Sequence, residues 1–170
     1  MGKAGHDIGF FIFSKTNTMD WLSIKTGLLE YCHEYVEERI SYMQNAIREA
    51  REAGNSESKS SVGDKYETAK AMAQLEQEKY ALQLEEAYKL KKALATISPD
   101  KTASGVGPGS LVITDKGAFY LSISAGKYVV GGKEVFLISP VAPVAVAMLS
   151  RKPGDTITVN GRTMEIREVY

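Results

Sequence analysis

The sequence is poor in residues that form metal sites and disulfides: its 170 residues include one cysteine and two histidines. The lone Cys32 cannot form an internal disulfide, which favours a reducing, cytoplasmic location. Together with His6 and His33 it provides fewer ligands than the four of a structural zinc site. No apolar run approaches the roughly 20 residues of a membrane helix, so we expect no membrane-spanning segment.

The chain also lacks an excess of either charge, with 21 basic and 21 acidic side chains. Proteins that coat nucleic acid need a cationic excess to neutralise phosphates. Residues 1–98 carry 13 basic and 15 acidic side chains, and residues 99–170 carry 8 and 6. This mild split favours a protein partner over naked DNA.

Residues 1–18 are interpreted as a poorly ordered extension, with the folded part beginning near Met19. Within it, Ile8–Phe13 is the segment most similar to a targeting signal. This run is short for a secretory signal, and no small-residue cleavage site follows it. A signal peptide therefore stays the less favoured alternative.

Proline is absent before Pro99, and glycine recurs among β-branched and aromatic residues after it. Helices first and strands later predict an α+β protein. We expect a helical hairpin over residues 19–98, a linker over 99–109 and a small β domain over 110–170.

The first helix is predicted from Asp20 to Glu52, ended by Gly54-Asn55. One apolar stripe follows it in steps of three and four residues: Leu29, Cys32, Val36, Ile40, Met43, Ile47 and Ala50. The second helix is predicted from Asp64 to Ile97. Its looser stripe comprises Met72, Leu75, Leu82, Leu90, Leu94 and Ile97, widened by Tyr80, Leu84 and Ala87.

Two helices of about 50 Å joined by a short connection predict an antiparallel coiled-coil hairpin that projects into solvent. Its tip, about residues 54–66, is rich in serine and charge, as any solvated loop is. A helical bundle completed by a second copy of the chain is the alternative, although we favour a monomer.

The last part of the chain has the alternation and turn signals of strands. Gly131-Gly132 and Asn160-Gly161 each lie between two apolar segments and predict tight hairpins. Pro143–Leu149 is a short apolar helix. The pattern predicts a small, strongly bent antiparallel sheet with one helix.

Several segments resemble the Gre factors, GreA and GreB, over roughly residues 28–170. Ile47–Gly54 resembles the end of their first helix, and Lys65–Lys70 the start of their second. Gly109–Val112 is similar to the first strand of their C-terminal domain. Ser139-Pro140, followed by Ala147–Asp155, resembles the family's Ser-Pro to Gly-Asp segment.

The resemblance implies an FKBP-like C-terminal domain that docks on RNA polymerase and a coiled coil that enters its secondary channel. It implies a transcription elongation regulator that is not itself an enzyme, binds no cofactor tightly and meets nucleic acid only through the transcription complex. In the family, acidic tip residues help to hold a Mg²⁺ shared with the polymerase, which then cleaves the backtracked transcript.

The tip departs from the family pattern, because about four extra residues precede Tyr66 and neither alignment register gives the acidic pair. Glu57 and Asp64 are the remaining candidates for Mg²⁺ coordination, with lysines beside them that compete for their charge. We therefore expect polymerase binding without transcript cleavage, with cleavage as the alternative. The polar contacts expected from the tip are made by Lys59, Ser60, Ser61, Lys65 and Tyr66.

Docking on the polymerase is assigned by the resemblance to the segments on either side of the short helix. The candidate residues are Ser139, Pro140, Arg151, Lys152, Gly154 and Asp155. Two other functional classes stay open. One is a dimeric coiled-coil scaffold. The other, less favoured, is a peptidyl-prolyl isomerase, since the only tryptophan, Trp21, lies outside the β domain.

Overall fold

The computed structural model describes residues 21–56, 63–100, 105–130 and 133–170. These residues form two compact units. One is His33–Ala93, and the other joins the described residues up to Cys32 with Leu94–Tyr170. The second unit therefore contains the start of the first helix, which composition alone assigned to the hairpin.

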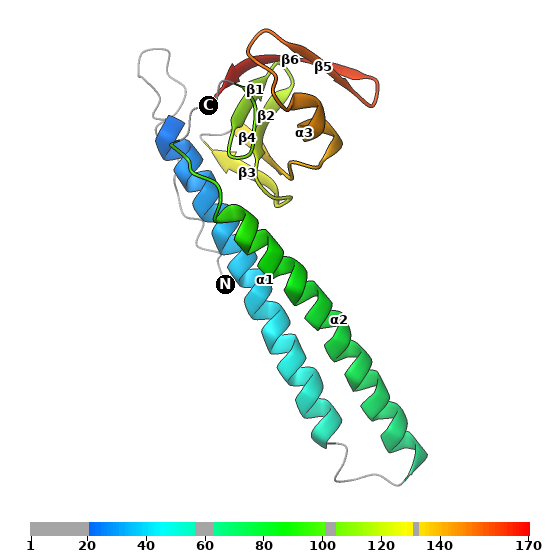
Figure 1. Ribbon diagram of the computed structural model, residues 1–170. Coiled ribbons are helices and arrows are strands. Elements are labelled where there is room, and N and C mark those ends of the chain that lie inside the picture. Colours follow the sequence, from blue (N-terminus) through cyan, green and yellow to red (C-terminus); the bar gives the residue numbers. More distant parts are fainter. Residues whose placement is uncertain (1–20, 57–62, 101–104, 131–132) are drawn as a thin grey trace. The chain divides into compact units, whose positions relative to one another are not determined.

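The hairpin consists of α1 (Trp21–Ser56) and α2 (Asp64–Leu94), shown side by side in Figure 1. Lys91 Nζ lies 2.6 Å from Glu37 Oε1, and Gln44 donates a hydrogen bond of 3.1 Å to the Tyr88 hydroxyl. The partner on α2 moves back from Lys91 to Tyr88 as the partner on α1 moves forward from Glu37 to Gln44, so the two helices are antiparallel and the predicted hairpin is confirmed. Neither described helix has the length and apolarity needed to cross a membrane.

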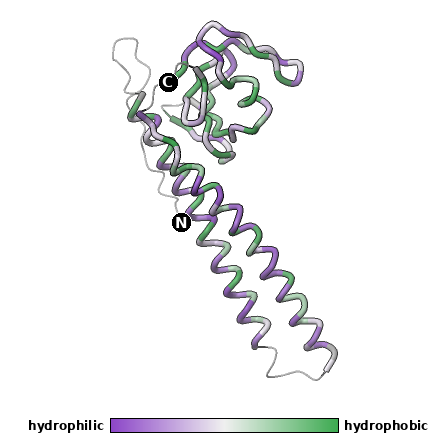
Figure 2. Tube along the Cα trace, viewed as in Figure 1, coloured by the Kyte–Doolittle hydropathy of each residue, from purple (hydrophilic) through white to green (hydrophobic). Residues whose placement is uncertain are grey.

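The apolar stripe predicted for α1 is confirmed. Its members lie on one side of the helix, at the spacing of a coiled-coil seam, and Figure 2 shows hydrophilic residues alternating with them. The residues of the stripe with at most 8% of their surface exposed are Leu29, Cys32, Val36, Ile40, Met43 and Ala50.

The stripe predicted for α2 is wrong in its first half. Met72, Leu75 and Leu82 are each about two-thirds exposed. The side of α2 that is more buried follows a strict seven-residue spacing: Tyr66, Ala73, Tyr80, Ala87 and Leu94. Small alanines alternate with tyrosines at the first four of these positions, and large aliphatic side chains join the buried side only toward the end of α2, where Leu84 and Leu90 are half-buried and Leu94 is fully buried.

The predicted end of the first helix at Gly54-Asn55 is also wrong, because α1 continues to Ser56. A Cβ atom on Gly54 would lie only 3.1 Å from the Cβ of Ala73 on α2. Gly54 is therefore explained by close helix packing and not by a left-handed helix end.

The second unit contains a six-stranded sheet in the order β3-β4-β2-β1-β6-β5. All neighbouring strands are antiparallel except β2 and β4, which pair in parallel, so the predicted antiparallel sheet is confirmed apart from this one pair. The strands are β1 (Leu111–Thr114), β2 (Gly117–Leu121), β3 (Gly126–Val130), β4 (Lys133–Ile138), β5 (Thr156–Val159) and β6 (Arg162–Val169).

Both predicted hairpins are present as antiparallel strand pairs, β3 with β4 and β5 with β6. Asn160 and Gly161 have φ of 51° and 73°, the values of the expected tight turn. Gly131 and Gly132 lie outside the described residues. The predicted short helix is α3 (Pro143–Met148), whose Ala145 and Met148 are fully buried against Val112, Leu121 and Ile166.

The start of α1 belongs to the same unit as the sheet. Leu28 is fully buried, and the rings of Tyr31 and Tyr128 lie 4.4 Å apart. The Cys32 thiol is fully buried 3.3 Å from the Ser122 hydroxyl, and burial raises its pKa. Cys32 is thus a core residue, as the sequence predicted.

Tyr120 is fully buried on β2, and its hydroxyl has no hydrogen-bond partner within the described residues. A buried hydroxyl without a partner costs about 1–3 kcal/mol. We therefore expect Tyr120→Phe to leave the free energy of unfolding unchanged or to raise it by about 1 kcal/mol in urea denaturation. A loss above about 1 kcal/mol would show that the hydroxyl is bonded.

Candidate docking surface

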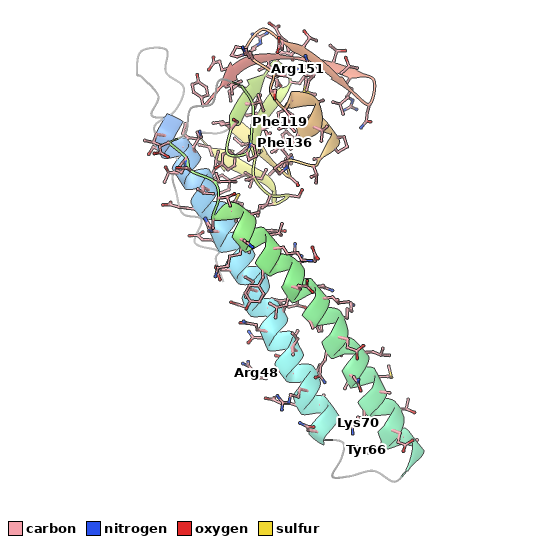
Figure 3. All side chains as sticks on the ribbon, in the orientation of Figure 1. Arg48, Tyr66, Lys70, Phe119, Phe136 and Arg151 are labelled. Atoms are coloured by element: carbon pink, nitrogen blue, oxygen red, sulfur yellow. The ribbon has the colours of Figure 1, made fainter. Side chains whose placement is uncertain are left out.

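The candidate docking residues lie on both sides of α3. Ser139 and Pro140 follow β4 and are half-buried, whereas Arg151 and Lys152 follow α3 and are exposed. Figure 3 shows the Arg151 side chain in this part of the unit. Neither cation forms an ion pair with another side chain of the described residues, so both charges are available to a partner.

Hydrogen bonds fix the loop that carries these two cations. The Lys152 N–H donates to the Asp155 carboxylate at 2.9 Å, and the Asp155 N–H donates to the Lys152 carbonyl at 3.0 Å. Gly154 has φ of 93° and donates its N–H to the Ile166 carbonyl at 2.8 Å. Gly154 and Asp155 therefore shape the turn, and Arg151 and Lys152 are the side chains that it presents.

The glycine-rich segment before β1 holds the other side of this loop. The Val106 N–H donates to the Arg151 carbonyl at 2.9 Å, and the Ser150 N–H donates to the Val106 carbonyl at 2.8 Å. A Cβ atom on Gly105 would lie 3.1 Å from the Ser150 carbonyl oxygen. The backbone at Arg151 is thus positioned by a segment that is distant in the sequence.

Sequence reasoning missed an apolar part of the same surface. Val141 is 82% exposed, Val146 is 55% exposed, and Leu149 is 38% exposed. Because Ala145 and Met148 face the core, Val146 lies on the outer side of α3, and Leu149 is the residue that follows the last turn of this helix. The spacing of α3 already contained this signal, since a short helix cannot bury both sides. Apolar side chains beside two cations fit a partner surface that is both apolar and acidic.

Most candidate residues of the tip lie outside the described residues. Glu57, Lys59, Ser60 and Ser61 lie outside the described residues, as does the Asp64 side chain at the first position of α2. Lys65 is exposed. Tyr66 is half-buried, and its N–H donates to the Gly63 carbonyl at 3.2 Å. Within the described part of the chain, no three acidic, histidine or cysteine side chains are grouped as metal ligands.

Two labelled side chains in Figure 3, Tyr66 and Lys70, lie near the start of α2, and a third, Arg48, lies on α1. The Arg48 guanidinium donates to the Asn45 amide oxygen at 3.0 Å, so it interacts within its own helix. Mg²⁺ coordination by Glu57 and Asp64 remains a prediction.

Comparison of the chain with models of known protein families, with curated proteins and with solved structures finds no match.

Proposed function

We propose that this protein is a transcription regulator of the Gre type that binds RNA polymerase without stimulating transcript cleavage. The observation that carries the proposal is the surface around α3. The segments that resemble the Gre factors border this helix, and one of them presents Arg151 and Lys152 to solvent. Val141 and Val146, which lie between the two segments, are exposed as well.

The hairpin supports the same proposal. At 1.5 Å per residue its helices of 36 and 31 residues measure about 54 and 46 Å, so the hairpin has the elongated form that insertion into a channel requires. The unit His33–Ala93 is stabilised by its own seam, and Lys91 and Glu37 form an ion pair within it. In this proposal α1 and α2 enter the secondary channel, and the FKBP-like domain of the Gre factors corresponds to the unit with the sheet.

The absence of cleavage is inferred from the tip sequence. Lys59 and Lys65 stand near Glu57 and Asp64 and compete with a metal ion for their charge. Any Mg²⁺ involved would be shared with the polymerase, because the proposal includes no tightly bound cofactor. The protein would therefore occupy the channel and leave the polymerase's own cleavage rate unchanged.

Reversing the two exposed charges tests the docking surface. We expect Arg151→Glu with Lys152→Glu to weaken binding of core RNA polymerase by at least about tenfold, because like charges then face each other. Binding is measured by biolayer interferometry with the full chain at two salt concentrations.

The matched control is Arg162→Glu with Arg167→Glu, which makes the same charge change at exposed positions of β6. We expect this control to retain most of the affinity. Equal losses in the two double variants would show that net charge, and not the surface around α3, determines binding.

A dimeric coiled-coil scaffold is the second candidate, favoured by the exposed Met72, Leu75 and Leu82 on α2. Exposed apolar residues on one side of a helix are typical of helix–helix contacts. Light scattering distinguishes the candidates, because a scaffold has twice the mass of one chain at micromolar concentration.

A further inference from the structure

A groove of about 430 Å³ lies within the unit His33–Ala93, between α1 and α2. Ala50, buried in the seam, forms part of its lining. Its polar lining comes from both helices: Tyr42, Asn45 and Glu49 from α1, and Glu76 and Tyr80 from α2. The groove is distinct from the surface around α3 and from the tip.

Two tyrosines form its aromatic part. The rings of Tyr42 and Tyr80 meet edge to face, with centroids 6.4 Å apart and an angle of 82° between their planes. Tyr42 is 61% exposed, so much of its ring is open to a ligand. Tyr80 already attracts a cation, because Lys79 Nζ lies 6.0 Å from its ring centroid. Electron-rich ring faces of this kind bind cations.

Two carboxylates give the groove its charge. Glu49 and Glu76 are exposed, and neither carboxylate forms an ion pair within the described residues. The lining includes no lysine or arginine, and Lys79, which lies over the Tyr80 ring, pairs with neither glutamate. The pKa of Tyr80 is raised, first by Tyr42 and to a lesser extent by Glu76 and Glu49. The groove therefore combines negative potential with aromatic surface.

We propose that this groove binds the guanidinium group of an arginine side chain presented by a partner protein. A guanidinium stacks on a tyrosine ring and donates paired hydrogen bonds to a carboxylate at the same time. An ammonium group is a compact, strongly hydrated charge and uses such a combination less well. The inference does not depend on the identity of the partner.

The test is an NMR titration of the full-length protein with N-acetyl-arginine amide, following the ring signals of Tyr42 and Tyr80. We expect saturable shifts with a dissociation constant of about 1 mM, as befits a single side chain. N-acetyl-citrulline amide, which has the same shape without the charge, should produce no saturable shift. N-acetyl-lysine amide should bind several-fold more weakly.

Substitutions of Glu49 and Glu76 test whether their carboxylates bind the guanidinium group. Glu49→Gln and Glu76→Gln should each weaken binding of the arginine amide by at least about fivefold, a typical loss for a charge-assisted hydrogen bond. Glu38→Gln, at an exposed position of α1 outside the groove, should bind as the unmodified protein does. Circular dichroism checks that all three remain helical.

Three outcomes would overturn the inference. Equal shifts with the citrulline amide would exclude recognition of charge. Equal affinity for the lysine amide would exclude a guanidinium site. Unchanged affinity in both Glu49→Gln and Glu76→Gln would place the bound arginine elsewhere. None of these results depends on RNA polymerase, so the proposed function is tested separately.

Discussion

Met43→Asp is expected to unfold a large part of the helical hairpin. Met43 is 6% exposed and lies in the α1 seam between Val36 and Ala50. Placing an unpaired carboxylate there costs several kcal/mol, because the charge loses its hydration and gains no partner. That loss is a large fraction of the stability of a small unit. Thermal denaturation followed by circular dichroism at 222 nm measures the effect.

Leu75→Asp is the matched control, since it makes a comparable apolar-to-acidic change at a side chain that is 65% exposed. A surface substitution of this kind changes the free energy of unfolding by about 0.5 kcal/mol or less. Equal destabilisation by the two variants would contradict the packing of α1 and α2 described here and would restore Leu75 to the seam.

Leu28→Asp is expected to destabilise the unit that contains the sheet by several kcal/mol, although Leu28 lies in a helix. Leu28 is fully buried in the first part of α1, near Tyr31 and Cys32, which contact Tyr128 and Ser122. An unpaired carboxylate buried at this position would disrupt the packing of the first part of α1 within the unit that contains the sheet. Amide hydrogen exchange in β1, β2 and β4 should accelerate together.

Leu22→Asp provides the control, because Leu22 is 49% exposed in the same helix. Its exchange rates should match those of the unmodified chain. The same reasoning predicts that residues 99–170 alone fold poorly, since they lack α1. Slow exchange in Leu28→Asp, or a stable isolated fragment of residues 99–170, would show that the sheet needs no helix support.

The sequence predicted α1 well and α2 poorly for a physical reason. In α1 the seam consists of large apolar residues such as Val36, Ile40 and Met43, so the large apolar side chains of this helix are also its buried ones. In α2 the more buried side has Ala73 and Ala87, and the larger Leu75 and Leu82 face solvent. A pattern weighted by side-chain size therefore followed the exposed side at Met72, Leu75 and Leu82 and the buried side only toward the end of α2.

In the sheet, a hairpin encoded by adjacent residues was predicted, whereas a pairing between strands that are distant in the sequence was not. Asn160-Gly161 predicted the β5–β6 hairpin correctly because a two-residue turn specifies its own backbone geometry. The parallel pairing of Phe119 with Phe136, whose stacked rings lie 5.4 Å apart, joins strands that have β3 between them in the sequence. No local turn residue encodes such a pairing, so the antiparallel sheet was predicted without its one parallel pair.

The candidate site was only partly accessible from the sequence. Arg151 and Lys152 were found through the family resemblance, and both are exposed. Val141 was missed, because an exposed valine beside a proline looks like an ordinary turn residue. The groove with Glu49 and Glu76 was missed because its parts come from two helices whose register the sequence did not define.

We propose that this protein binds RNA polymerase at the secondary channel without stimulating cleavage, and one assay tests this proposal most directly. The most direct measurement uses a backtracked transcription complex and follows transcript cleavage by a cleavage-active Gre factor while this protein is titrated in. We expect no cleavage with this protein alone and progressive inhibition of the active factor, as for two ligands of one channel. Mg²⁺-dependent cleavage by the unmodified protein, lost in Asp64→Ala, would contradict the account. So would full activity of the Gre factor in the presence of excess protein.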